Sequence, residues 1–143
     1  MDLKSLLFSF QGRINRQPFW LAIWGAFFSA IVIMVLARFA LPVGLQAIAT
    51  TVIALALLWV GLALSVKRAH DLDRGWGLVA LSYAPNIALY AFQAIRAFAP
   101  EHRLAELLIL LTGFVVGLMP VVKLLFFRGT QGSNQFGSNP LSA

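Results

Sequence analysis

The sequence predicts an all-α integral membrane protein, a compact bundle of four transmembrane helices with a short amphipathic interfacial segment before the first of them. Two observations predict this class. The chain of 143 residues is 60% hydrophobic and 11% charged, whereas soluble domains are about one quarter charged. Long uncharged runs also alternate with short basic stretches, which is typical of chains that cross a membrane several times. The mean hydropathy of +0.85 agrees with this class.

Four apolar segments are long enough to cross about 30 Å of hydrocarbon. They cover residues 18–37, 43–66, 76–95 and 105–127 and leave a tail at 128–143, so one four-span domain accounts for residues 1–143. Pro18 suits the first turn of the first helix, and Pro42 marks the turn before the second. In the fourth segment Lys123 lies near the end, where its side chain can extend to the interface.

The distribution of basic residues assigns the sides of the membrane. With the N-terminus inside, eight Lys and Arg residues lie on the cytoplasmic side and three, Arg38, Arg96 and Arg103, lie in the outer loops. Because Lys and Arg are enriched in cytoplasmic loops, both termini are expected in the cytoplasm. The chain is then expected to cross its membrane several times.

The segment before the first span has an apolar face. Leu3, Leu6, Leu7 and Phe10 follow the spacing of one side of a helix. We therefore expect a short helix lying on the inner surface of the membrane, with a disordered end as the alternative.

Composition excludes several kinds of site. The chain has no cysteine, so it forms no disulfide and uses no thiol chemistry. Its formal charge of +6 is spread over the ends of the apolar runs instead of one cluster, so no nucleic-acid partner is expected. His70 and Asp71 resemble a metal-ligand pair, but His102 is expected on the opposite side, so neither a metal nor a cofactor is expected.

Small residues recur at four-residue spacing, which lets helices approach closely. Ala22, Ala26 and Ala30 do so in the first span, and Gly113 and Gly117 do so in the fourth. The spacing predicts a packing seam, within the chain or between two copies in a homo-oligomer.

The third span carries a polar stripe that should not face lipid. Its members share one face of a continuous helix and are Ser82, Tyr83, Asn86, Tyr90 and Gln93. Pro85 should bend this helix near mid-depth. The stripe is either a buried hydrogen-bonded seam or the wall of a polar path.

Three segments are expected on the cytoplasmic side, at residues 12–20, 67–76 and 128–140, and they could meet there. Their arginines offer forked donors suited to phosphate or carboxylate, and the Gly-rich tail could offer backbone N–H groups to an anion. The candidate residues for binding an anion, a lipid or a partner are Arg13, Arg16, Arg68, His70, Asp71, Arg74, Asn134 and Gly137.

These segments resemble the signature stretches of domain of unknown function family 805, which are small bacterial inner-membrane proteins. The matching residues are, in order, Arg13, Arg16, Phe19 and Trp20; Arg68, His70, Asp71, Arg74 and Trp76; and Gly132, Asn134, Phe136, Gly137 and Pro140. The chain departs from the pattern at Gln135, where a basic residue is common, and at Asn139, where an acid is common. The resemblance implies a location in the inner (plasma) membrane of a bacterium and four spans, and it implies no established activity.

Three functions are compatible with these observations. The leading hypothesis is a non-enzymatic module whose cytoplasmic face binds anionic lipid headgroups or a partner protein, although the arginines could also serve only as topological anchors. A second hypothesis is a small carrier or channel subunit that uses the polar stripe. A third is a membrane enzyme acting on a phosphorylated lipid through His70 and Asp71, but no nucleophile is identifiable and no catalytic residue is assigned.

Overall fold

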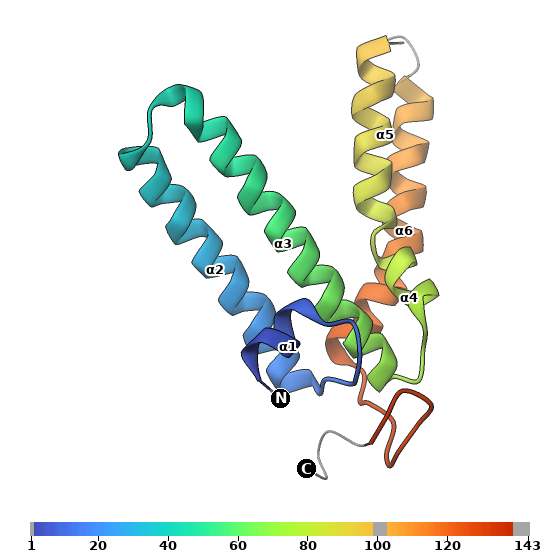
Figure 1. Cartoon of the computed structure of the whole chain (residues 1–143). Coiled ribbons are helices and arrows are strands. Elements are labelled where there is room, and N and C mark those ends of the chain that lie inside the picture. Colours follow the sequence, from blue (N-terminus) through green and yellow to red (C-terminus); the bar gives the residue numbers. More distant parts are fainter. Residues whose placement is uncertain (1, 99–102, 139–143) are drawn as a thin grey trace. The chain divides into compact units, whose positions relative to one another are not determined.

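A computed structural model of the chain describes residues 2–98 and 103–138, and all regular secondary structure within those ranges is helical (Figure 1). The chain divides into two compact units. The first unit comprises Met1–Asp73 together with Arg128–Ala143, and the second comprises Arg74–Phe127.

The first unit is built on a hairpin of two long helices, α2 (Arg16–Ala40) and α3 (Val43–Asp71) (Figure 1). Asn15 caps the start of α2 by accepting a hydrogen bond from the main-chain N–H of Arg16. At the turn, the Gln46 side chain donates to the carbonyl oxygens of Arg38 (3.2 Å) and Leu41 (3.0 Å). These bonds satisfy carbonyl groups that a helix end leaves without a partner. The helices contain the predicted spans at 18–37 and 43–66.

A short helix, α1 (Leu3–Phe8), precedes the hairpin and packs against α3. Asp2 is its N-cap, because its side chain accepts from the Ser5 main-chain N–H at 3.3 Å. Hydrogen bonds from Ser5 lower the pKa of Asp2 below its ordinary value. The ring of Phe10 meets that of Trp59 edge to face, with 5.1 Å between centroids. The amphipathic segment predicted at the N-terminus thus includes a helix.

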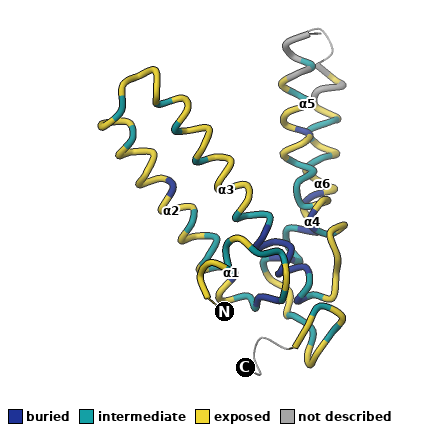
Figure 2. The backbone as a smooth tube through the Cα atoms, viewed as in Figure 1, coloured by how far each residue is buried: buried dark blue, intermediate teal, exposed yellow. Residues whose placement is uncertain are grey.

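The hairpin exposes apolar side chains along most of its length and buries charged side chains together with apolar ones at one end, which is unusual for a soluble protein. Exposed positions run along most of α2 and α3, and buried positions gather at the C-terminal end of α3 (Figure 2). The buried positions include Lys67, Arg68 and Asp71. Such a surface suits lipid along the helices and a packed polar end.

The second unit contains α4 (Trp76–Ser82), α5 (Ala84–Phe98) and α6 (Arg103–Phe126). A methyl group placed on Gly113 would overlap Ala88, and one on Gly117 would overlap Pro85, so α5 and α6 meet closely at these glycines. The predicted seam at Gly113 and Gly117 is therefore a contact within the chain.

The segment expected to form one helix at 76–95 is divided at Tyr83. This residue ends α4, and α5 begins at Ala84 with Pro85 in its first turn. A proline has no N–H to donate to the carbonyl four residues before it, here that of Leu81 in α4, and its ring crowds that carbonyl, whereas it is well tolerated at a helix start. The expected bend is therefore a break, and it separates Ser82 and Tyr83 from the rest of the polar stripe.

Within residues 2–98 and 103–138, three helices are long and apolar enough to cross a membrane: Arg16–Ala40, Val43–Asp71 and Leu107–Phe126. At 1.5 Å per residue, α5 alone is about 22 Å long, which is shorter than the hydrocarbon layer. The four-helix count and the orientation stay predictions.

Candidate functional site

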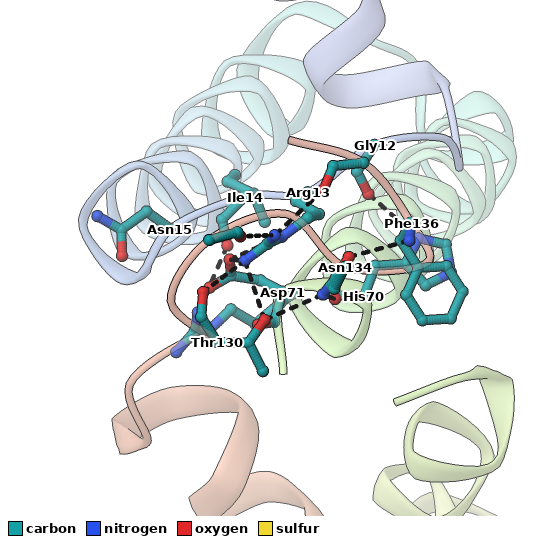
Figure 3. Close-up of polar contacts among 12 residues, drawn as sticks. Gly12, Arg13, Ile14, Asn15, His70, Asp71, Thr130, Asn134 and Phe136 are labelled. Carbon is teal, nitrogen blue, oxygen red and sulfur yellow. Dashed lines mark hydrogen bonds and ion pairs between the residues drawn. The ribbon is translucent and has the colours of Figure 1, made fainter. Parts of the chain in front are cut away.

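Three segments that are distant in the sequence meet at one end of the α2–α3 hairpin (Figure 3). The Ile14 main-chain N–H donates to the Lys67 carbonyl at 3.3 Å, which joins the segment before α2 to the end of α3. The Thr130 N–H donates to the Asp71 carbonyl at 2.8 Å, which joins the tail to the same place. The tail is therefore docked on the segments with which the sequence suggested it could meet.

Asp71 is the centre of a buried ion-pair cluster. Its Oδ1 accepts from Nε (3.3 Å) and Nη2 (3.1 Å) of Arg13, and its Oδ2 accepts from Nη1 of Arg68. The Arg13 and Asp71 side chains are only 1% and 3% exposed. We call Arg13, Arg68 and Asp71 the clamp. Two guanidinium groups share one carboxylate, so the clamp retains a net positive charge.

The remaining donors of Arg13 hold the tail. Its Nη2 donates to the carbonyl (2.8 Å) and hydroxyl (3.1 Å) oxygens of Thr130, and its Nη1 donates to the carbonyls of Gly132 (2.8 Å) and Gly137 (3.3 Å). Each nitrogen of the guanidinium group thus has an acceptor. A planar fork with fixed donors is well suited to join a carboxylate and several carbonyls at once. Arg13 connects the two parts of the first unit that are furthest apart in the sequence.

The glycines of the tail fit this docking. Gly132 and Gly137 have positive φ angles of 77° and 135°, which side-chain-bearing residues rarely adopt. A methyl group on Gly129 would overlap the Asp71 carboxylate. Several tail N–H groups donate within the protein, and the tail turns carbonyl oxygens toward Arg13. Carbonyl groups of the docked tail thus bind the guanidinium cation of Arg13. Anion binding by N–H groups of the tail stays a prediction.

His70 lies beside the clamp in a different role from the one the enzyme hypothesis requires. Its ring stacks on Phe136 with 3.9 Å between centroids and 7° between planes, and its Nδ1 lies 3.1 Å from the Gly12 carbonyl. The Asn134 side chain donates to the His70 carbonyl at 2.8 Å. The carboxylate of Asp71 faces the two arginines, so it does not orient the imidazole as a general base.

Lys67 is a buried residue of this region that sequence reasoning did not select. Its ammonium group donates to the carbonyl of Ser5 and, at 2.6 Å, to that of Leu6, both in α1. Cations interact well with the carbonyls of the last turn of a helix. The sequence showed only a basic residue after an apolar run, a signal that indicates topology. Thr130 was also missed, because an isolated threonine in a loop has no distinguishing pattern.

Two further candidate arginines, Arg16 and Arg74, are not members of the clamp as defined above. Arg16 is half-buried at the start of α2, near enough to Arg68 for their charges to repel. Arg74 is exposed and begins the second unit. Of the polar stripe, Ser82 donates to the Val79 carbonyl at 2.7 Å, and the exposed members on α5 are Asn86, Tyr90 and Gln93.

The fold and site define an α-helical protein whose described part contains three helices suited to crossing a membrane and a buried ion-pair clamp at one end of a helical hairpin. The family "Protein of unknown function (DUF805)" matches residues 7–138, so the chain belongs to that family. This confirms the resemblance seen in the three segments.

Two curated relatives extend over nearly the whole chain. Both are named "Uncharacterized protein YiiR", one from Escherichia coli strain K12 and one from Escherichia coli O157:H7. Each is 32% identical to this chain over 97% of its length and 90% of the relative's length. No solved structure matches the chain.

Proposed function

We propose that this protein is a non-enzymatic, four-span module of a bacterial inner membrane, with both termini in the cytoplasm, whose cytoplasmic face binds anionic lipid headgroups. The observation that carries the proposal is the excess of positive charge at the clamp end of the hairpin. There two buried arginines share a single carboxylate.

The docking of the tail supports an even number of crossings. The bond between Thr130 and Asp71 keeps the tail on the side of the membrane where α3 ends. Between these residues, α6 is long and apolar enough to cross once. The chain between Asp71 and Thr130 returns to the side from which it started, so it crosses the membrane an even number of times. With one crossing by α6, we infer that α4 and α5 together supply the second. They run over residues 76–98, about 34 Å at 1.5 Å per residue, which suffices despite the break at Tyr83.

The charge distribution supports the orientation. The segments at 1–16, 67–73 and 128–138 hold six basic and three acidic residues, whereas the turn between α2 and α3 has Arg38 nearby as its basic residue. Since basic residues are retained on the cytoplasmic side, the clamp end is the inner end. The bond between Ile14 and Lys67 keeps the N-terminal segment on that side too.

The charge at the clamp end favours an anionic membrane surface. Arg13 and Arg68 are buried within the protein, so they attract anionic lipid only through the electrostatic potential that they create. Lys4 and Arg128 are exposed and can contact headgroups directly. Each basic residue near an anionic surface contributes about 1 kcal/mol to binding. The clamp residues are thus positioning residues that fix the tail, and with it Arg128, beside the bilayer.

The test is lipid retention by the purified full-length protein. Native mass spectrometry after incubation with equal amounts of phosphatidylglycerol and phosphatidylcholine should show preferential retention of the anionic lipid. A Lys4→Gln, Arg128→Gln double variant should reduce that preference about tenfold or more, given about 1 kcal/mol per basic residue, whereas Arg38→Gln at the other end should not. Equal retention of both lipids by the wild type would contradict the proposal, and a co-purifying protein lost in the double variant would point to a protein partner instead.

A further inference from the structure

The part of the polar stripe that lies on α5 has hydrogen-bonding groups that the described residues do not use. We call Asn86, Tyr90 and Gln93 the α5 stripe. All three are exposed, and none of their side chains exchanges a hydrogen bond with another described residue. By contrast, the hydroxyls of Thr50 and Thr51 in α3 donate to carbonyls of their own helix at 2.8 and 2.9 Å. The α5 stripe is therefore free to bond a partner from outside the described fold.

The α5 stripe faces away from α6, the helix on which α5 packs. The close approach to Gly113 of α6 is made by Ala84 and Ala88 of α5 (Figure 1). At 100° per residue, each member of the stripe lies about 120–180° around α5 from these two alanines. The helix thus has one face of small residues against α6 and a polar face on the far side.

The proposed crossing by α4 and α5 puts this polar face inside the membrane. At 1.5 Å per residue, Asn86 lies about 15 Å along residues 76–98, near mid-depth, and Gln93 lies about 10 Å further on. An unpaired amide in hydrocarbon has no water to bond, which is costly. A stripe at this depth therefore requires a polar partner. This step rests on the crossing in the proposed function and not on lipid binding.

The other spans of the chain offer no comparable partner. Residues 18–40 of α2, residues 47–66 of α3 and all of α6 contain neither asparagine nor glutamine. Gln46, at the α2–α3 turn, already donates to two carbonyls there. A side-chain amide has both donors and acceptors, so one amide is the complement of another. A second copy of this chain supplies the same amides at the same depth.

The spacing of the α5 stripe fits a pair of parallel helices. Its members are separated by four and then three residues, which is the interval of the contacting positions in a coiled coil. Two copies inserted with the same orientation are related by a two-fold axis along the membrane normal, and such an axis places each residue beside its counterpart. Membrane helices with this spacing cross at about 20° and use polar side chains to hold together. Asparagine pairs of this kind also fix the register of two helices.

We propose that the α5 stripe joins two copies of this protein in the membrane, with Asn86 of one copy hydrogen-bonded to Asn86 of the other and Gln93 paired in the same way. The contact goes beyond the proposed function, because it lies within a span and uses none of the basic residues at the clamp end. In this pair the amides bond each other instead of lining a polar path.

Disulfide crosslinking in native membranes tests the contact directly. The chain has no cysteine, so each variant carries one per copy. Tyr90→Cys lies between the two amides of the stripe and leaves both in place. Val115→Cys is the control, because Val115 is exposed and lies about 160° around α6 from Gly113, on the side away from α5. With copper phenanthroline in air, Tyr90→Cys should form linked dimers at least about tenfold faster than Val115→Cys. Equal rates would overturn the proposal.

Sedimentation equilibrium of the purified full-length protein in a density-matched detergent measures the association without a crosslink. The Asn86→Leu, Gln93→Leu double variant should raise the dissociation constant of the pair about tenfold, the effect of about 1.4 kcal/mol. Thr51→Val is the control, because its hydroxyl is already bonded within α3. Circular dichroism should show the same helix content in the wild type and both variants. Equal dissociation constants for the double variant and the control would exclude the stripe as the contact.

The result separates this proposal from the proposed lipid binding. A wild type that is monomeric at every ratio of protein to detergent and gives equal crosslinking at residues 90 and 115 would overturn the pair. Preferential retention of phosphatidylglycerol by that monomer would leave the lipid proposal standing. A pair that forms through the stripe but shows no lipid preference would support the contact and contradict the lipid proposal.

Discussion

Arg13 and Asp71 are 58 residues apart in the sequence, yet their buried side chains form an ion pair at 3.1 Å that also organises the C-terminal tail. Asp71 bonds both arginines of the clamp, and Arg13 bonds three residues of the tail. The stability of this end of the molecule therefore depends on a few charged groups whose loss leaves other charges buried without a partner.

Replacing Asp71 by Asn should be strongly destabilising. The change leaves Arg13 and Arg68 buried without an anion, and removing one partner of a buried pair costs about 3–5 kcal/mol. Unfolding of the purified protein in detergent, followed by circular dichroism, measures this loss. Asp73→Asn is the matched control, because Asp73 is exposed and its positive φ of 55° suits asparagine. Similar stabilities for the two variants would show that the clamp is not closed in the folded protein.

Gly129→Ala should release the tail while leaving the hairpin folded. Its added methyl group would overlap the Asp71 carboxylate, so Thr130 could no longer reach the Asp71 carbonyl. Limited proteolysis should then cleave the tail faster than in the wild type. Gly44→Ala is the control, because its Cβ would lie in open space. A tail equally resistant in Gly129→Ala would contradict the docking described here.

Arg13→Lys should fail to replace arginine even though it keeps the charge. A lysine ammonium has three donors at one point, and it cannot bond Asp71, Thr130 and Gly132 together as the guanidinium fork does. Hydrogen exchange of residues 130–137 should rise nearly as much in Arg13→Lys as in Arg13→Ala. Full protection in Arg13→Lys would show that charge alone holds the tail.

Low pH should loosen α1 through its cap. The pKa of Asp2 is lowered by Ser5, so the folded helix favours the charged carboxylate. The contribution of the cap is present above the ordinary pKa of 3.8 and is lost as the pH falls through the lowered value. Hydrogen exchange of residues 3–8, compared with an Asp2→Ala variant at each pH, should show protection that depends on Asp2 at neutral pH and declines as the pH falls below 3.8. A constant difference between the two proteins would contradict this role.

The membrane class and the hairpin could be predicted from the sequence because they depend on uncharged run length. The division at Tyr83 could not be placed, because Pro85 is compatible with both a bend and a new helix start. The sequence also could not distinguish the role of Arg13 from that of Arg16. Arg13 and Arg16 are equivalent as basic residues beside a span, and only the position of Asp71 makes one a buried partner. Lys67 was interpreted as a topological residue, whereas it also anchors α1.

The proposed topology predicts the accessibility of single cysteines. The chain has none of its own, so each introduced cysteine reports alone. A membrane-impermeant maleimide added to intact bacterial spheroplasts should label Val43→Cys at the α2–α3 turn and Leu104→Cys near the start of α6, both exposed positions. It should label Ser133→Cys in the tail only after permeabilisation. The docked tail lies on the side of the membrane where α3 ends. If residue 104 were labelled from the same side as residue 133, α4 and α5 together would not cross the membrane. A crossing by α6 would then put the tail on the side opposite to the end of α3. That result would exclude four spans, and the opposite pattern at all three sites would reverse the orientation while keeping the four spans.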